Sequence, residues 1–461
     1  MNDKTFFSLA YGAAFTDGER AVAFSNLEAL LPKFREGDAW LRKNASLGTE
    51  GFGWLNLPKR NTDEIQTLSR WLATRESIVQ VGIGGSALGN LMLHGALLPP
   101  YWNELTNAKR GGPRFFMSDN VDPIDNRAIW DLINPESTAV IVVSKSGSTA
   151  ETAANFLFFW DKLRDTLGEA AARERVVVVT DKEKGILRPF VDEIGCKSLI
   201  LPEDVGGRFS VLSCVGLLSA WALGIDCKAL LYGAAAMDES VAKADSVLGN
   251  PAWIVSGLAY LHMEKSRNIN VLMPYSDSME RFGEWFAQLW GESIGKDGKG
   301  STPVRALGAI DQHSQIQLYT SGPDDKLYTI LTVAHGQKDI ALPAAQEKAF
   351  EKLSYLYGKS MDELRNCEAF ATAAALSKAG RPVVTLSIPS MDAYHLGALI
   401  QFYEYVTGMT GHLMGVNPFD QPGVEQGKDY TYGLMGRSGF EAQAQEVEAL
   451  AAKINERTAT I

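Results

Sequence analysis

Cysteine is scarce in this chain and follows no pattern. The 461 residues contain only four, at wide spacing: Cys196, Cys214, Cys227 and Cys367. No two of them form a C-x-x-C pair, so the sequence has neither a thiol redox motif nor a zinc knuckle. We therefore expect free thiols, buried or half-buried, in a reducing compartment.

Long apolar runs and an excess of basic residues are also missing. The longest apolar run, residues 211–225, is short of the roughly 20 residues that cross a bilayer, so we expect a buried helix there. The N-terminus lacks the basic start and apolar core of a signal peptide. The net charge of −11 argues against a nucleic-acid surface. The sequence therefore predicts a soluble, cytoplasmic protein without a nucleic-acid or membrane partner.

What is present is the composition of an ordinary globular protein. Hydrophobic residues make up 46% of the chain and charged residues 21%, which excludes wholesale disorder. Short runs rich in Val and Ile recur without alternation, as expected of buried parallel strands. The runs are residues 77–81, 115–117, 138–143, 176–179 and 198–201 in the first half, and 270–273, 328–333 and 383–388 in the second.

Helical patterns separate these runs, and alternating strands and helices predict an α/β fold. We expect two doubly wound parallel-sheet domains, over residues 46–232 and 233–430, with a helical segment over residues 1–45 and a helical arm over 431–461. A capping box at residues 438–441 is expected to begin the terminal helix, which packs through an apolar stripe.

Two glycine- or hydroxyl-rich loops follow predicted strands, and ligands bind beyond the carboxyl ends of strands in such sheets. Loop 82–89 (GIGGSALG) fits G-x-G-x-x-A, but the acid that a dinucleotide site needs about 20 residues later is missing. Ser86 there suits a phosphate monoester or a sugar hydroxyl. Loop 144–152 (SKSGSTAET) places five hydroxyls at a helix start, where they form an anion site or, more simply, a helix cap.

An arginine and a glutamate stand next to glycines at the ends of predicted elements. Arg208 follows Gly206 and Gly207, which let the backbone approach a ligand; otherwise it is a surface arginine in a turn. Glu292 ends a helix with one apolar face, where the helix dipole disfavours its charge. It is either a general base or a solvated glutamate.

Only six histidines occur, and no pair has metal-ligand spacing. His313 lies among polar residues in an otherwise apolar region, and by itself it suits a structural role. Lys428 ends the polar segment 419–428 (FDQPGVEQGK). It either pairs with Glu425 on the surface or stabilises charge on a ligand.

Taken together, these clusters resemble the signatures of the glucose-6-phosphate isomerase family. Segment 203–210 (EDVGGRFS) is similar to the family's arginine signature, and segment 419–428 is similar to its C-terminal signature. The resemblance spans roughly residues 45–435. The family has two sugar-isomerase (SIS) domains, so it implies the two α/β domains expected above.

The resemblance implies a role for each motif position. Glu292 moves a proton between C2 and C1 through a cis-enediol, Arg208 steadies the enediolate, and His313 and Lys428 assist opening of the sugar ring. The residues implied to hold the phosphate are Ser144, Lys145, Ser146, Thr149 and Thr152, and those implied to line the sugar site are Gly85, Ser86 and Gln421. No metal or organic cofactor is implied.

The resemblance also implies a homodimer, because in this family the neighbouring subunit supplies the equivalent of His313. Larger relatives have an aromatic residue where this chain has Gly147 and a tryptophan where it has Pro422. Neither change removes a catalytic group.

The expected activity is therefore interconversion of glucose 6-phosphate and fructose 6-phosphate, in glycolysis and gluconeogenesis. Two alternatives stay open. One is a dual isomerase that also accepts mannose 6-phosphate. The other is a non-catalytic SIS-domain sensor, which would need neither Glu292 nor His313 nor Lys428.

Overall fold

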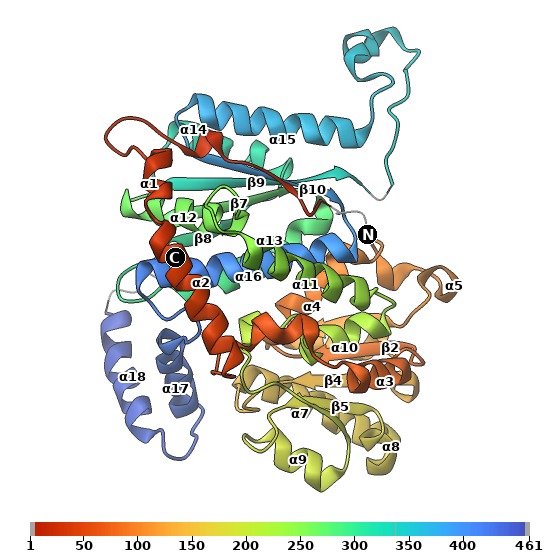
Figure 1. The fold of residues 1–461 in the computed structure, drawn as a ribbon. Helices are drawn as coiled ribbons and strands as arrows, with labels where there is room; N and C mark the ends of the chain where they lie inside the picture. The colour runs from red at the N-terminus through yellow and green to blue at the C-terminus, as the bar shows by residue number, and fades with distance from the viewer. Residues whose placement is uncertain (1–4, 337, 457–461) are drawn as a thin grey trace. The chain divides into compact units, whose positions relative to one another are not determined.

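A computed structural model describes residues 5–336 and 338–456 of the chain (Figure 1). These residues form two compact units, of which the first ends at Phe419 and the second begins at Asp420. The first unit contains two five-stranded sheets. Helices cover both faces of each sheet, as the sequence predicts for an α/β fold (Figure 1).

The first sheet is parallel throughout, in the order β3-β2-β4-β5-β6. Its strands are β2 (Ser77–Val81), β3 (Arg114–Ser118), β4 (Thr138–Val143), β5 (Val176–Thr180) and β6 (Lys197–Ile200). The connecting helices are α4 (Leu88–Leu97), α5 (Asn107–Arg110), α6 (Pro123–Leu132), α7 (Ala150–Leu167), α8 (Glu169–Arg173) and α9 (Leu187–Ile194). The strand order reverses between β2 and β4, and such a switch point is where ligands bind in open α/β sheets.

Alternate residues of the central strands pack into two different hydrophobic cores, because successive side chains of a strand point to opposite faces of the sheet. Val140, Val142 and Val178 pack with Phe159 and Leu163 of α7 on one face. Ile141, Val143 and Val179 belong to the large core on the other face. Strands buried on both faces carry no alternation, which is why their sequences are continuous Val and Ile runs.

The second sheet has the order β1-β10-β9-β7-β8. Its parallel strands are β7 (Ile269–Tyr275), β8 (Thr302–Arg305), β9 (Lys326–His335) and β10 (Val383–Ser390), and the antiparallel edge strand is β1 (Ser8–Ala10). The connecting helices are α13 (Glu280–Ile294), α14 (Ile316–Ser321) and α15 (Met361–Lys378). Helices α14 and α15 cover the outer face of this sheet (Figure 1).

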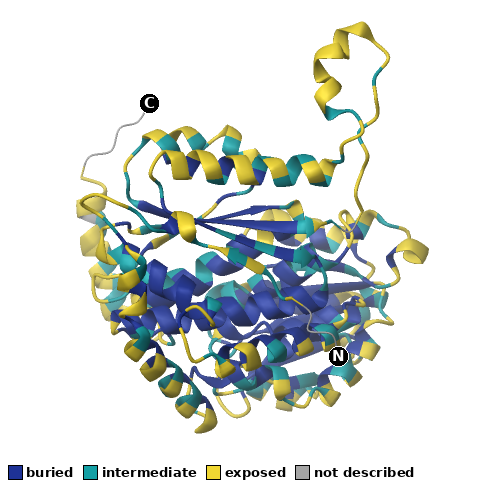
Figure 2. Cartoon of the chain, turned by 45° about the horizontal axis from the view of Figure 1, so that its top comes forward, coloured by how far each residue is buried: buried dark blue, intermediate teal, exposed yellow. Residues whose placement is uncertain are grey.

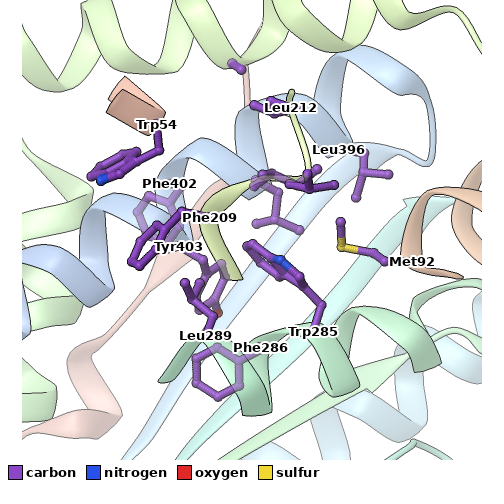
Figure 3. Packing of buried hydrophobic residues seen from close by; sticks show 14 of the residues in the cluster. Trp54, Met92, Phe209, Leu212, Trp285, Phe286, Leu289, Leu396, Phe402 and Tyr403 are labelled. Atoms are coloured by element: carbon purple, nitrogen blue, oxygen red, sulfur yellow. The ribbon is translucent and has the colours of Figure 1, made fainter. Parts of the chain in front are cut away.

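A layer of helices between the two sheets forms the main core of the first unit. It includes α4 and α13 together with α10 (Cys214–Ala222), α11 (Cys227–Lys243), α12 (Pro251–Glu264) and α16 (Ala393–Met414). Burial is concentrated in these helices and in the sheets (Figure 2). Aromatic side chains such as Trp54, Phe209, Trp285 and Tyr403 fill the core (Figure 3).

The remaining segments either precede the first sheet in the chain or belong to the second unit. Residues before the first sheet form α1 (Phe24–Glu28), α2 (Leu31–Ser46), the 3-10 helix η2 (Gly53–Lys59) and α3 (Asp63–Leu72). The second unit contains η10 (Pro422–Val424), α17 (Glu425–Leu434) and α18 (Glu441–Ile454). Within it α18 packs on α17, since a Cβ atom on Gly433 would lie 2.7 Å from the backbone nitrogen of Ala444.

The prediction of parallel α/β sheets is confirmed, and all eight predicted strands are present. The segment predicted as helical before residue 45 also supplies strand β1, which pairs with β10. The predicted capping box is wrong, because α18 begins after Phe440. The backbone N–H of Gly439 donates to Oε1 of Glu441 instead (3.0 Å). The φ of +89° at Gly439 turns the chain before the helix.

Two further expectations concern thiols and the apolar run. The four cysteines are free, as predicted, but Cys367 is exposed on α15 rather than buried. The apolar run forms the buried helix α10. Within the described ranges, no helix has the length and apolar character to span a membrane. The predicted domain boundaries stay a prediction.

Candidate active site

Two loops leave the carboxyl ends of β2 and β4 side by side at the switch point. The strands are paired, with Val81 opposite Val142. A Cβ atom on Gly82 would lie 3.2 Å from the carbonyl oxygen of Val143, the residue before Ser144. The two loops that the sequence indicated as ligand loops therefore start in contact with each other.

The loop after β4 gathers hydroxyls and backbone N–H groups at the start of α7. The Oγ atom of Ser144 accepts a hydrogen bond from the Gly147 backbone (3.0 Å), and Ser148 donates to Ser146 (2.9 Å). Thr149 is the N-cap residue of α7, but its side chain makes no capping bond. Thr152 lies buried in the first turn. This arrangement suits an anion, because donors at a helix N-terminus point toward it.

Lys145 connects this loop to the arginine segment. Its Nζ atom donates to the carbonyl oxygen of Glu203 (2.8 Å) and lies 3.6 Å from the Glu50 carboxylate. Glu203 begins segment 203–210, so the loop after β4 and the arginine segment are joined by this hydrogen bond within the first unit.

The loop after β2 presses on the turn that carries Arg208. A Cβ atom on Gly85 would lie 2.2 Å from the carbonyl carbon of Gly207, closer than any side chain could fit. Ser86 ends the same loop in the 3-10 helix η3 (Gly84–Ser86), and Arg208 lies in η6 (Gly207–Phe209). Glycine at position 85 is therefore required by the close approach of two backbones.

Arg208 is buried and uses all of its guanidinium nitrogens. Its Nε atom donates to Ser293 Oγ (2.7 Å) and its Nη2 atom to the carbonyl oxygen of Pro418 (2.7 Å). Its Nη1 atom donates to Oε2 of Glu292 (3.1 Å). The structure thus brings together Arg208 and Glu292, and the surface-arginine alternative is wrong.

Glu292 lies in the last turn of α13, with its side chain 31% exposed. Its second oxygen, Oε1, accepts a hydrogen bond from Gln288 Nε2 (2.9 Å). A Cβ atom on Gly84 would lie 2.8 Å from the same Nε2 atom, so the loop after β2 lies against the amide that holds this carboxylate. Both oxygens are held in place while part of the side chain faces solvent.

Sequence inspection missed Gln288, Ser293 and Pro418. The only signal for Gln288 is its position four residues before Glu292, on the same helix face. The Pro418 contact comes from a backbone carbonyl, which no side-chain pattern indicates.

His313 lies away from these groups in the same chain. It ends the 3-10 helix η8 (Ile310–His313), which is held at the carboxyl end of β7 by a bond from Tyr275 to Gln312 (2.8 Å). The end of α13 near Glu292 lies instead beside the start of β8, where Trp290 donates to Ser301 (3.0 Å). His313 therefore lies near the carboxyl ends, and Glu292 near the amino ends, of the neighbouring strands β7 and β8.

Gln421 and Lys428 belong to the second unit. Lys428 lies in α17, and its Nζ atom donates to Oε1 of Glu425 (2.9 Å), as the surface-pair alternative expects. Gln421 precedes η10 as its N-cap residue. Among the described side chains, no group of three or more His, Cys, Asp and Glu residues could hold a metal ion.

Comparison with known proteins identifies the family of this chain. Residues 70–443 match the family model "Phosphoglucose isomerase". A glucose-6-phosphate isomerase of Rubrobacter xylanophilus is 47% identical over 92% of this chain and 97% of its own length. The chain belongs to the phosphoglucose isomerase family.

Solved structures share the fold. A hypothetical protein of Thermus thermophilus matches with a TM-score of 0.82 and 36% identity, over 89% of this chain and 97% of its own. A glucose-6-phosphate isomerase of Chlamydia trachomatis matches with a TM-score of 0.77 and 23% identity, over 96% of this chain and 92% of its own.

Proposed function

We propose that this chain interconverts glucose 6-phosphate and fructose 6-phosphate by general acid–base catalysis, and so acts in glycolysis and gluconeogenesis in the cytoplasm. Membership of the family supports the reaction. The observation that carries the proposal is a single half-buried carboxylate, Glu292, held by Gln288 and Arg208 beside two ligand loops. Aldose–ketose isomerisation needs one base to move one proton between neighbouring carbons.

Glu292 takes the proton from C2 of open-chain glucose 6-phosphate and returns it to C1. The C2 hydroxyl loses its proton and the C1 oxygen gains one, so the cis-enediol becomes fructose 6-phosphate. Negative charge develops on the enediolate oxygens, and Arg208 lies next to the base with a guanidinium that stabilises it. Because Arg208 is fixed by Ser293 and Pro418, it needs no reorganisation during the reaction.

The phosphate group binds to the loop after β4. The hydroxyls of Ser144, Ser146, Thr149 and Thr152, the Lys145 ammonium and the first N–H groups of α7 supply the donors. Gly85 and Ser86 line the sugar between this loop and Glu292, since their loop contacts both sides. Gln421 is a further residue that we assign to sugar binding, on the family resemblance of segment 419–428 alone.

His313 and Lys428 assist ring opening, and the active protein is a homodimer in which His313 comes from the partner. The position of His313 supports this. Gly283 lies beside Arg305 at the end of β8, and from Gly283 to Glu292 the helix rises roughly 14 Å. The end of β8, which His313 follows in the chain, therefore lies well away from Glu292, and this separation favours a histidine from the partner.

A coupled assay for conversion of fructose 6-phosphate to glucose 6-phosphate tests the reaction. Turnover in heavy water should place deuterium at C2 of the product, and activity should survive excess chelator. The variant Glu292→Gln should lose turnover while it still binds the phosphate end of the substrate. Unchanged turnover in this variant would remove Glu292 as the base.

A further inference from the structure

Helix α16 is buried on all sides yet carries polar side chains in its middle. Its 22 residues run from Ala393 to Met414, and His412 is the only one not fully buried. Thr407 and Thr410 satisfy their hydroxyls within the helix, by donating to the carbonyl oxygens of Tyr403 and Val406 (2.8 Å each). The side chains of Gln401 and Glu404 make no such hydrogen bonds within the helix.

Gln401 and Glu404 are 1% and 0% exposed, and among the described residues neither side chain has a hydrogen-bond partner. They lie three positions apart, so they share one face of the helix. Burial raises the pKa of Glu404 well above its ordinary value. Burial thus favours the neutral form of Glu404, which has one donor and several acceptor positions, and leaving these without hydrogen bonds in a dry core is unfavourable.

The indole N–H group of Trp54 is a third polar group on the same side of α16. Gly408 lies one turn after Glu404, and a Cβ atom on it would lie 3.7 Å from Cζ2 of Trp54. This is the ring edge that also carries Nε1. The Nε1–H group of the fully buried Trp54 likewise has no acceptor in the described part of the chain. Figure 3 shows Trp54 beside Phe209 in this core.

We propose that Gln401, Glu404 and Trp54 line a buried hydration site in which ordered water molecules complete their hydrogen bonds. A water molecule both donates and accepts, so it can serve an amide, a carboxylic acid and an indole N–H together, and buried waters occupy sites with two to four polar partners. Water fits better than a buried cation, because a neutral acid supplies no charge to hold one.

The site lies directly behind the catalytic arginine. Trp54 stacks on Phe209 with 5.6 Å between ring centroids, and Phe209 follows Arg208 in the chain. Phe209 also contacts Phe419 at 5.3 Å, next to the Pro418 carbonyl that holds Arg208. The bound water thus supports the packing layer on which the arginine turn rests.

A high-resolution crystal structure of the full chain tests the proposal directly. It should show at least one ordered water within hydrogen-bond distance of two of the three side chains. A dry core, or a direct bond between Gln401 and Glu404, would overturn it. Infrared difference spectra of wild type minus Glu404→Gln at neutral pH should also show the C=O band of a protonated, hydrogen-bonded acid, whereas a carboxylate band would contradict the proposed neutral acid.

A double-mutant cycle tests whether the two side chains share water. Glu404→Met and Gln401→Met should each lower the urea midpoint, and the double variant should lower it by less than the sum of the two shifts. Glu404→Met combined with Tyr403→Phe is the control and should be additive, because Tyr403 faces Phe282 and Phe286 on another side of α16. Additivity in the first pair would overturn the shared site. Should the methionine variants not fold, the urea midpoint of Glu404→Gln is the remaining test. If Glu404 is a hydrated neutral acid, this variant should have almost the wild-type midpoint. A changed midpoint would indicate a buried charge instead.

Discussion

Arg208 donates a hydrogen bond of 3.1 Å to Glu292, although 84 positions separate the two residues in the chain. The first lies in a turn after the first sheet, and the second lies at the end of α13, which connects β7 and β8 of the second sheet. Their meeting places a fixed cation beside a partly exposed carboxylate. This pairing is the geometric basis of the proposed chemistry.

Arg208→Lys should lower turnover strongly, because one ammonium nitrogen cannot replace three directed bonds to Ser293, Glu292 and Pro418. Loss of a fixed donor to a developing oxyanion typically lowers kcat by about 10²–10³-fold. Steady-state kinetics with fructose 6-phosphate measure this. Arg164→Lys, on the exposed face of α7, is the matched control and should behave as wild type. Wild-type kcat in Arg208→Lys would contradict the assigned role.

Gly85→Ala should abolish most activity because its methyl group would overlap the Gly207 carbonyl and push the Arg208 turn away from Glu292. The control is Gly206→Ala, whose methyl group would meet only Phe209, at 3.8 Å. We expect a large loss of kcat/KM in the first variant and a small one in the second. An equal loss of kcat/KM in both variants would mean that helix or turn propensity, rather than the close approach of the two backbones, causes the loss.

Much of the fold followed from the sequence because the buried strands are continuous Val and Ile runs. The two strands that the sequence does not predict, β1 and β8, are short edge strands with partly exposed residues, so they lack this pattern. For the site, Arg208 and Glu292 could be located as single residues beside glycines. The contact between these two residues could not be predicted, because it depends on how the two sheets pack. The hydrogen bond from Gln288 could not be predicted either, since an amide on a helix face is common.

Acid should destabilise the protein through its buried histidines. Desolvation lowers the pKa of His94 from 6.5 to about 4, and chiefly desolvation lowers that of His262 to about 4. The unfolded chain binds these protons first, so stability is full above pH 6.5 and falls as the pH drops toward 4. Each histidine should account for roughly 1–2 kcal/mol of unfolding free energy between pH 7 and 5.

Urea unfolding of wild type and His94→Phe at several pH values measures this contribution. The phenylalanine keeps the ring contact with Phe115 (5.5 Å) but cannot be protonated, so the variant should lose less stability in acid. His335→Gln, at an exposed position, should follow the wild-type curve. Identical curves for wild type and His94→Phe would mean that His94 titrates normally.

Mixed dimers should recover activity if the partner supplies His313. Glu292→Gln and His313→Ala are each expected to be nearly inactive alone. In a mixed dimer, one site combines the intact Glu292 of one subunit with the intact His313 of the other, while the second site carries both changes. Random assortment makes half of the dimers mixed, so refolding the two variants together should restore about a quarter of wild-type activity. No recovery, with mixed dimers present by mass spectrometry, would place His313 and Glu292 of one chain in the same site, against their positions near opposite ends of strands β7 and β8.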